Sequence, residues 1–158
     1  MNNDVVILGV GNVLQSDDGA GVRALRALQA DPPPGALLVE IGAAILDAVP
    51  FLEGARRAII LDAVQGGGRP GRVYVLDADA LESARPATSL HGFGVLDAFR
   101  LLCPGSVLPP VVIVGVEPDR LGYGTELSAP VEAAIPLLAE TARAIAARAR
   151  PVLEGACA

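Results

Sequence analysis

The fold of this chain follows first from six residues near its start, Val5-Val-Ile-Leu-Gly-Val10. The run is apolar throughout and lacks polar alternation, which is typical of a strand that is buried on both faces of a sheet. After a glycine-rich loop, apolar residues recur at helical spacing from Val22 to Leu28. This part of the chain therefore predicts a buried strand, a loop and a helix, in that order.

Farther along the chain, strands and helices continue to alternate. Apolar patterns predict four more strands at residues 37–41, 58–62, 72–76 and 111–116, and helices around 45–52, 92–102 and 130–148. The 72–76 strand alternates in polarity, which places it nearer an edge of the sheet. Pro130 suits the first turn of the last helix. Most of residues 77–90 match no pattern and stay unassigned.

This order of elements predicts the α/β fold class. Strands that alternate with helices and lack polar alternation imply a mostly parallel five-stranded sheet with helices on both faces, a three-layer sandwich. A length of 158 residues with 52% hydrophobic content is enough for one core. We expect a single domain over residues 1–150 and a loose tail at 151–158.

Charge and cysteine content restrict the possible partners and compartment. The formal charge of -6 argues against a nucleic-acid partner, because such proteins concentrate Lys and Arg to neutralise phosphates. The apolar run at residues 5–10 is too short for a membrane span or a signal core. Cys103 and Cys157 have neither CxxC spacing nor the density of a disulfide scaffold. We therefore expect a cytoplasmic protein that does not bind a membrane.

Polar residues that follow the predicted strands are the candidates for chemistry. In open parallel sheets the functional crevice lies beyond the carboxyl ends of the strands. Asp17 and Asp18 follow the first predicted strand, Asp62 ends the third, and Glu117 and Asp119 follow the fifth. His91, the single histidine of the chain, precedes a predicted helix, where loops meet helix N-termini at the same crevice.

Each of these residues also has a structural interpretation. Asp62 could be a helix cap or a turn acid. Asp17 and Asp18 could be acids that a helix dipole favours in its first turn, and His91 could cap the helix that follows it. Cys103, before Pro-Gly at a helix end, is expected to be a small core residue.

Taken together, Asp18, Asp62 and His91 suggest a metal site. Two carboxylates and one imidazole at one sheet edge form a set of three ligands that leaves positions open, as in catalytic metal sites. Zinc, nickel, cobalt and manganese all suit these ligands, and ligand type does not choose among them.

The segment Gly9-Val-Gly-Asn12 superficially suggests a dinucleotide site. The third glycine of that motif is absent, however, because Leu14 stands in its place. We therefore expect no NAD. The glycines instead permit a tight exit from the first strand, and Asn12 is expected to hydrogen-bond a neighbouring loop.

A longer pattern resembles a known family. Leu8-Gly-Val-Gly-Asn-Val-Leu-Gln-Ser-Asp-Asp-Gly-Ala-Gly-Val22 is similar to the opening signature of the hydrogenase maturation endopeptidases. The resemblance continues at Ile59-Ile-Leu-Asp-Ala63, at Ser89-Leu-His-Gly-Phe-Gly-Val-Leu-Asp-Ala98 and at residues 112–119. It implies a twisted sheet between helices, like that of peptidyl-tRNA hydrolases and purine nucleoside phosphorylases.

The resemblance also implies an activity. Proteins of this family remove a C-terminal extension from the nickel-loaded precursor of a [NiFe] hydrogenase large subunit, and Asp18, Asp62 and His91 occupy their metal-contacting positions. Nickel would come from the precursor, although other divalent metals could occupy the site. Asp17 is a weaker candidate for handling protons. A transient one-to-one encounter suits such an enzyme, so we expect a monomer.

Two other functions stay open. One is a maturation factor that binds nickel or the precursor without cutting it. The other is a relative of the peptidyl-tRNA hydrolases, which share a Gly-x-Gly-Asn opening, but the acidic charge is wrong for a tRNA partner.

One segment departs from the family pattern. Where the family has an Asp-Gly-Gly-Thr type of loop, implicated in substrate recognition, this chain reads Glu40-Ile-Gly-Ala-Ala44. Which hydrogenase is recognised therefore stays open. Glu40 is the residue that could supply the missing acid.

Overall fold

A mixed sheet forms the centre of the molecule in the computed structural model, which describes residues 4–78, 88–89 and 91–148. The strand order is β2-β1-β3-β6-β4. The first four strands in this order are parallel to their neighbours, and β4 is antiparallel to β6 at the edge. The strands are β1 (Val5–Val10), β2 (Ala36–Gly42), β3 (Ala58–Gln65), β4 (Val73–Asp77) and β6 (Val111–Val116). This confirms the predicted five-stranded sheet and the edge position of the 72–76 strand.

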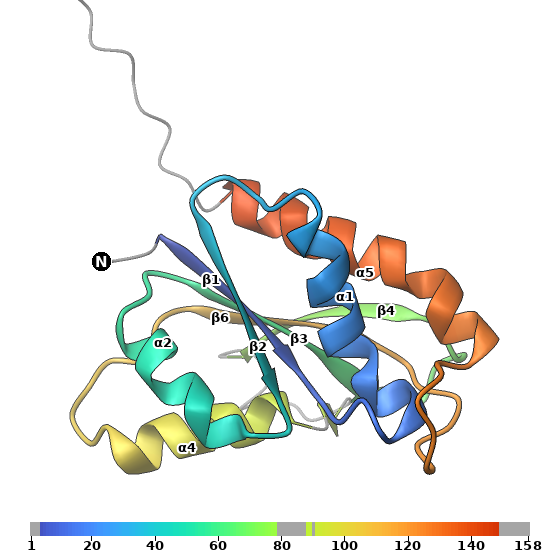
Figure 1. The fold of residues 1–158 in the computed structure, drawn as a ribbon. Coiled ribbons are helices and arrows are strands. Elements are labelled where there is room, and N and C mark those ends of the chain that lie inside the picture. Colours follow the sequence, from blue (N-terminus) through green and yellow to red (C-terminus); the bar gives the residue numbers. More distant parts are fainter. Residues whose placement is uncertain (1–3, 79–87, 90, 149–158) are drawn as a thin grey trace, which may run out of the picture.

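Helices cover both faces of the sheet (Figure 1). On one face, α1 (Ala20–Gln29) and α5 (Ala129–Arg148) pack over alternate residues of β1, including Val5 and Ile7. On the other face, α2 (Val49–Glu53) and α4 (Gly92–Leu102) cover the intervening residues, including Val6 and Leu8. Because successive side chains of a strand point to opposite faces, the unbroken apolar run of β1 supplies both cores. The predicted three-layer sandwich is confirmed. None of the helices in the described ranges combines the length and apolar character needed to cross a bilayer.

The start of α1 lies unusually close to the sheet. A methyl group on Gly21 would overlap the backbone oxygens of Leu61 and Val10, so only glycine fits here. The single turn that precedes α1, η1 (Ser16–Gly19), is thereby held against β3.

Two elements differ from the prediction. The helix expected around residues 45–52 is split into the 3-10 turn η2 (Ile45–Ala48) and α2. Pro50 explains the split, because it has no N–H to continue a helical hydrogen-bond ladder but fits the first turn of a new helix.

The second difference is a strand that the sequence did not predict. β5 (Thr88–Ser89) pairs antiparallel with Val64 and Gln65 at the end of β3. Two residues are too few to show a period, so no pattern could indicate this strand. The other unassigned residues 79–87 and 90, and the expected tail at 151–158, lie outside the described residues.

Candidate active site

Asp62 lies inside β3 and connects that strand to α4. The strand was predicted to end at Asp62, but it continues to Gln65. The carboxylate is fully buried, and its Oδ2 accepts hydrogen bonds from the backbone N–H groups of His91 at 2.7 Å and Gly92 at 2.8 Å. Its Oδ1 accepts a third from Ala63 at 2.8 Å. Asp62 therefore caps α4 from another element, and this cap fixes the position of His91.

His91 is the N-cap residue of α4, and its side chain does not cap that helix. Its ring faces two carboxylates instead. Nδ1 lies 3.4 Å from Oδ1 of Asp62 and 3.5 Å from Oδ1 of Asp18. The hydrogen bond to Asp62 raises the pKa of His91, burial opposes the rise, and the charges of Asp62 and Asp18 add to it. The two carboxylates therefore stabilise the protonated imidazole relative to the neutral one.

Asp18 reaches this group from η1. Its side chain is almost completely buried, and Oδ2 accepts a hydrogen bond from the backbone N–H of Asn12 at 2.9 Å. Burial raises the pKa of Asp18, and the nearby charge of Asp62 adds to the rise, while the Asn12 hydrogen bond and His91 oppose it. Gly11 makes the close approach possible, since its φ is +119° and a side chain there would overlap the Asp18 carbonyl oxygen.

The Asn12 side chain was predicted to bond a neighbouring loop, but within the described part of the chain its partner lies in its own loop. Its Oδ1 accepts the backbone N–H of Leu14 at 2.9 Å, two residues ahead in its own loop. This is the local turn that asparagine side chains often form, and it shapes the loop that leads into η1.

Asp17 points away from Asp18 and serves a different partner. Successive residues of a 3-10 turn project about 120° apart, which separates the two neighbouring carboxylates. Asp17 accepts backbone N–H groups from Asp119, Arg120 and Ser128, together with the Ser128 hydroxyl, at 2.7–2.9 Å. Burial alone would raise the pKa of Asp17, but these hydrogen bonds outweigh it and hold the pKa below its usual value. They fasten the loop between β6 and α5 to η1.

The other acidic candidates lie in separate networks. Glu117 accepts hydrogen bonds at 2.7 Å from the Gly66 N–H and from the Tyr74 hydroxyl, so it holds the turn before β4. Asp119 is exposed and contributes its backbone N–H to Asp17. Glu40 forms a two-pronged ion pair with Arg26, at 2.7 and 3.0 Å. Cys103 is half-buried and packs against the core, as expected of a small core residue.

The three predicted ligands are adjacent, although they do not form a finished cage. Across the described ranges, no group of three His, Cys, Asp or Glu side chains is arranged ready to hold an ion. The N···O separations of 3.4–3.5 Å are close to the roughly 3.4 Å expected between two ligands of a tetrahedral ion with bonds of about 2.1 Å. However, Asp62 is already bonded to three backbone N–H groups. An incoming ion would have to replace the contacts of His91 with the two carboxylates.

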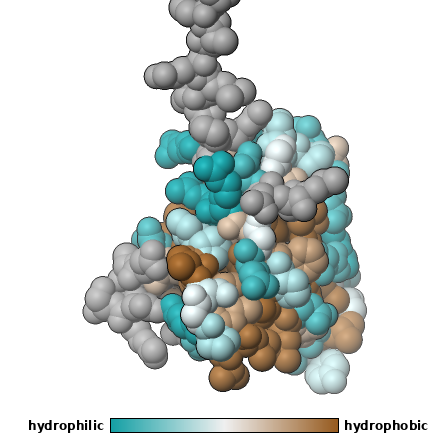
Figure 2. Space-filling view, turned by 90° about the vertical axis from the view of Figure 1, so that its left-hand side faces the viewer, coloured by the Kyte–Doolittle hydropathy of each residue, from teal (hydrophilic) through white to brown (hydrophobic). Residues whose placement is uncertain are grey.

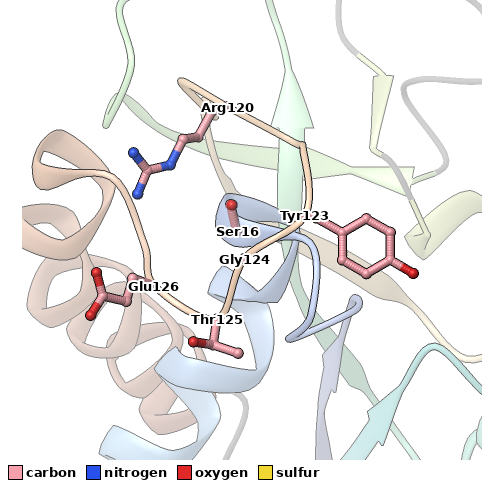
Figure 3. Close-up of a pocket in the computed structure, with 6 residues that line it drawn as sticks. All are labelled: Ser16, Arg120, Tyr123, Gly124, Thr125 and Glu126. Atoms are coloured by element: carbon pink, nitrogen blue, oxygen red, sulfur yellow. The ribbon is translucent and has the colours of Figure 1, made fainter.

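A hollow of about 390 Å³ opens beside η1, and sequence reasoning missed it. Ser16 lines it, and the rest of its wall comes from the loop before α5, at Arg120, Tyr123, Gly124, Thr125 and Glu126. Figure 3 shows that Arg120 and Tyr123 project to opposite sides of this loop. The only sequence signal was a tyrosine between two glycines, and that pattern does not by itself indicate a binding site.

A mostly parallel sheet between two layers of helices defines this protein as α/β, with two carboxylates and a histidine brought together from β3, η1 and the start of α4. The family model described as HycI, hydrogenase maturation protease, matches residues 22–145. The hydrogenase expression/formation protein HupD of Bradyrhizobium diazoefficiens is 32% identical, over 97% of this chain and 87% of its own. HoxM of Cupriavidus necator is 33% identical over 83% and 68%. The chain therefore belongs to the hydrogenase maturation protease family, as its resemblance predicted.

Solved structures agree with this assignment. The [NiFe] hydrogenase maturation protease HybD of Thermococcus kodakarensis superposes with a TM-score of 0.77 at 28% identity, covering 90% of this chain and 98% of its own. The maturating endopeptidase HybD of Escherichia coli gives a TM-score of 0.78 at 27% identity, covering 91% and 92%. The fold described above is thus the fold of these proteases.

Proposed function

We propose that this chain is an endopeptidase that removes the C-terminal extension from the nickel-loaded precursor of a [NiFe] hydrogenase large subunit. Membership of the maturation protease family supports the reaction class. The observation that carries the proposal is the meeting of Asp18, Asp62 and His91 at one point, although they are far apart in sequence. We keep the expectation of a cytoplasmic monomer that meets one precursor at a time.

The three side chains have different tasks in this proposal. Asp62 is the fixed member, because its buried carboxylate is held by three backbone N–H groups and in turn sets the position of His91. Asp18 and His91 are the members that change partners when the substrate arrives. Burial raises the pKa of Asp18, and the Asp62 hydrogen bond raises that of His91, so both suit the uptake and release of a proton near the scissile bond.

Nickel enters as part of the substrate. Carboxylate and imidazole donors suit a divalent ion, and an ion held by the precursor would polarise the scissile carbonyl as a Lewis acid. Asp18, Asp62 and His91 would contact that ion and so align the peptide bond with the site. Asp17 takes no part in the chemistry, since its carboxylate already accepts four hydrogen bonds.

The direct test mixes the purified protein with nickel-loaded and with nickel-free precursor and follows the mass of the large subunit. Loss of the extension from the nickel-loaded form alone supports the full proposal. Equal processing of both forms would remove nickel from the mechanism and leave the protease activity. Stable binding of the precursor without any change in mass would instead identify a non-proteolytic maturation factor.

A further inference from the structure

Two apolar side chains stand exposed beside the site. Tyr123 is 95% exposed and Leu14 is 54% exposed. They lie on different loops that are joined directly, because the Gly124 N–H donates to the Leu14 carbonyl at 3.0 Å. We call these two residues the Leu14–Tyr123 edge. Apolar surface left in water is unfavourable in free energy, and an exposed apolar pair beside a site is typical of a binding surface.

The exposure does not come from a loosely held loop. The backbone is bonded to η1 on both sides of Tyr123, through Gly122 O to the Ser16 hydroxyl and through Gly124 O to the Ser16 N–H, both at 2.8 Å. Asp17 adds its hydrogen bonds on either side of this segment, at Arg120 and Ser128. An aromatic ring on a fixed backbone loses little conformational entropy when a partner covers it, as is typical of binding anchors.

The edge lies next to Asp18 along both loops. Leu14 is two residues beyond Asn12, whose N–H binds the Asp18 carboxylate. Gly124, the neighbour of Tyr123, pairs with Ser16, which is two residues before Asp18. The edge is therefore attached to η1, the same turn that carries Asp18.

Another group of exposed apolar residues lies at and after the C-terminal end of α4. Leu101 and Leu102 end α4, which extends about 16 Å away from His91, and Val107 follows before β6 begins. Figure 2 shows apolar surface gathered low on the side of the molecule where α2 and α4 lie. Nothing on the described part of that surface identifies an occupant. It serves as the natural control for the edge beside the site.

We propose that the Leu14–Tyr123 edge binds apolar side chains of the precursor segment that flanks the scissile bond. This rests on the proposed function, since the occupant is the substrate of that reaction. A peptide bond can reach Asp18 and His91 only where the segment leaves the fold of its own protein, and such a segment arrives with its side chains uncovered. The edge buries those side chains, while the adjoining hollow beside Arg120 and Thr125 leaves room for the chain to continue.

Steady-state cleavage of the nickel-loaded precursor tests this proposal. Tyr123→Ala is expected to raise KM about tenfold and Leu14→Ala about threefold, with kcat within about twofold of wild type. Tyr123→Phe retains the ring and should keep the wild-type KM. Leu102→Ala is the matched control, because Leu102 is also 54% exposed, and it should change neither constant.

The outcomes separate the two proposals. If wild-type protein cleaves the precursor and both alanine variants at the edge keep its KM, the edge is not a binding surface. A fall in kcat at constant KM, or an equal rise in KM for Leu102→Ala, would overturn the inference as well. If wild-type protein binds the nickel-loaded precursor but does not cleave it, the proposed function fails. The edge is then tested by the dissociation constants of the same variants for the precursor, in place of KM. Thermal unfolding should be alike in all variants, since each of the three substituted side chains is more than half exposed.

Discussion

Two buried carboxylates stand next to each other in this chain and belong to different parts of the molecule. Asp17 accepts four hydrogen bonds from uncharged donors and fastens the loop before α5. Asp18 accepts one backbone hydrogen bond and faces a histidine that a second carboxylate also approaches. The pKa of Asp17 is lowered and that of Asp18 is raised. A fully satisfied carboxylate builds structure, whereas one with few donors beside another acid is suited to chemistry.

The largest expected effect comes from changing the reactive member. Asp18→Asn should lower kcat/KM for the nickel-loaded precursor by about 10² to 10³, because the site loses a charge that contacts the substrate's ion and a group able to exchange a proton. Stability should stay within about 1 kcal/mol of wild type, since asparagine can still accept the Asn12 N–H and its repulsion with Asp62 is removed. Mass spectrometry of the precursor and urea unfolding measure the two quantities. Near-normal cleavage by this variant would show that Asp18 is not needed for the reaction.

Changing the structural member should produce the reverse. Asp17→Asn places an NH₂ group against backbone N–H donors, so at least one buried donor loses its acceptor, and the free energy of unfolding should fall by about 2–4 kcal/mol. Urea unfolding measures this loss. Asp119→Asn is the control on the same loop, because that side chain is exposed, and its effect should stay within about 0.5 kcal/mol. If Asp17→Asn were as stable as wild type, the anchoring role of Asp17 would be wrong.

The predictable part of the fold came from buried strands. Residues 5–10, 58–61 and 111–116 are unbroken apolar runs, and each lies in a parallel strand of the sheet. The topological rule for open sheets then brought Asp18, Asp62 and His91 to one edge, where the structure places them together. Their catalytic and metal-binding roles stay predictions.

The tasks of individual acids could not be predicted. Asp17 and Asp18 look alike in sequence, and only the 3-10 turn η1 directs them to different partners. This turn begins at Ser16, and the φ of +51° at Ser16 is rare for a residue with a side chain. The backbone donors that satisfy Asp17 are more than 100 residues away. Tyr123 was overlooked for the same reason, because its fixed exposure depends on those long-range hydrogen bonds.

The pH dependence of unfolding tests whether the charge of Asp17 stabilises the fold. The folded-state pKa of Asp17 lies below the usual value of 3.8, so its stabilisation is fully present above that pH and is lost as the pH falls through the folded-state pKa. The stability difference between wild type and Asp17→Asn should therefore be constant near neutral pH and shrink below about pH 3.8. Urea unfolding at a series of pH values measures it. A difference that grows toward acid would show that the charge of Asp17 is not what stabilises the fold.

The smallest effect is expected at a third kind of carboxylate, one that is paired but exposed. Glu40 binds Arg26 in two places, and the hydrogen bond from Arg26 lowers the pKa of Glu40, yet both side chains are more than a third exposed. Water screens such a pair, so Glu40→Gln should cost no more than about 0.5 kcal/mol in urea unfolding. Cleavage of the precursor should be unchanged, because Glu40 is held on β2 by Arg26 and is not directed at His91. A large loss of cleavage without loss of stability would instead make Glu40 the acid that replaces the missing Asp-Gly-Gly-Thr loop in recognising the substrate.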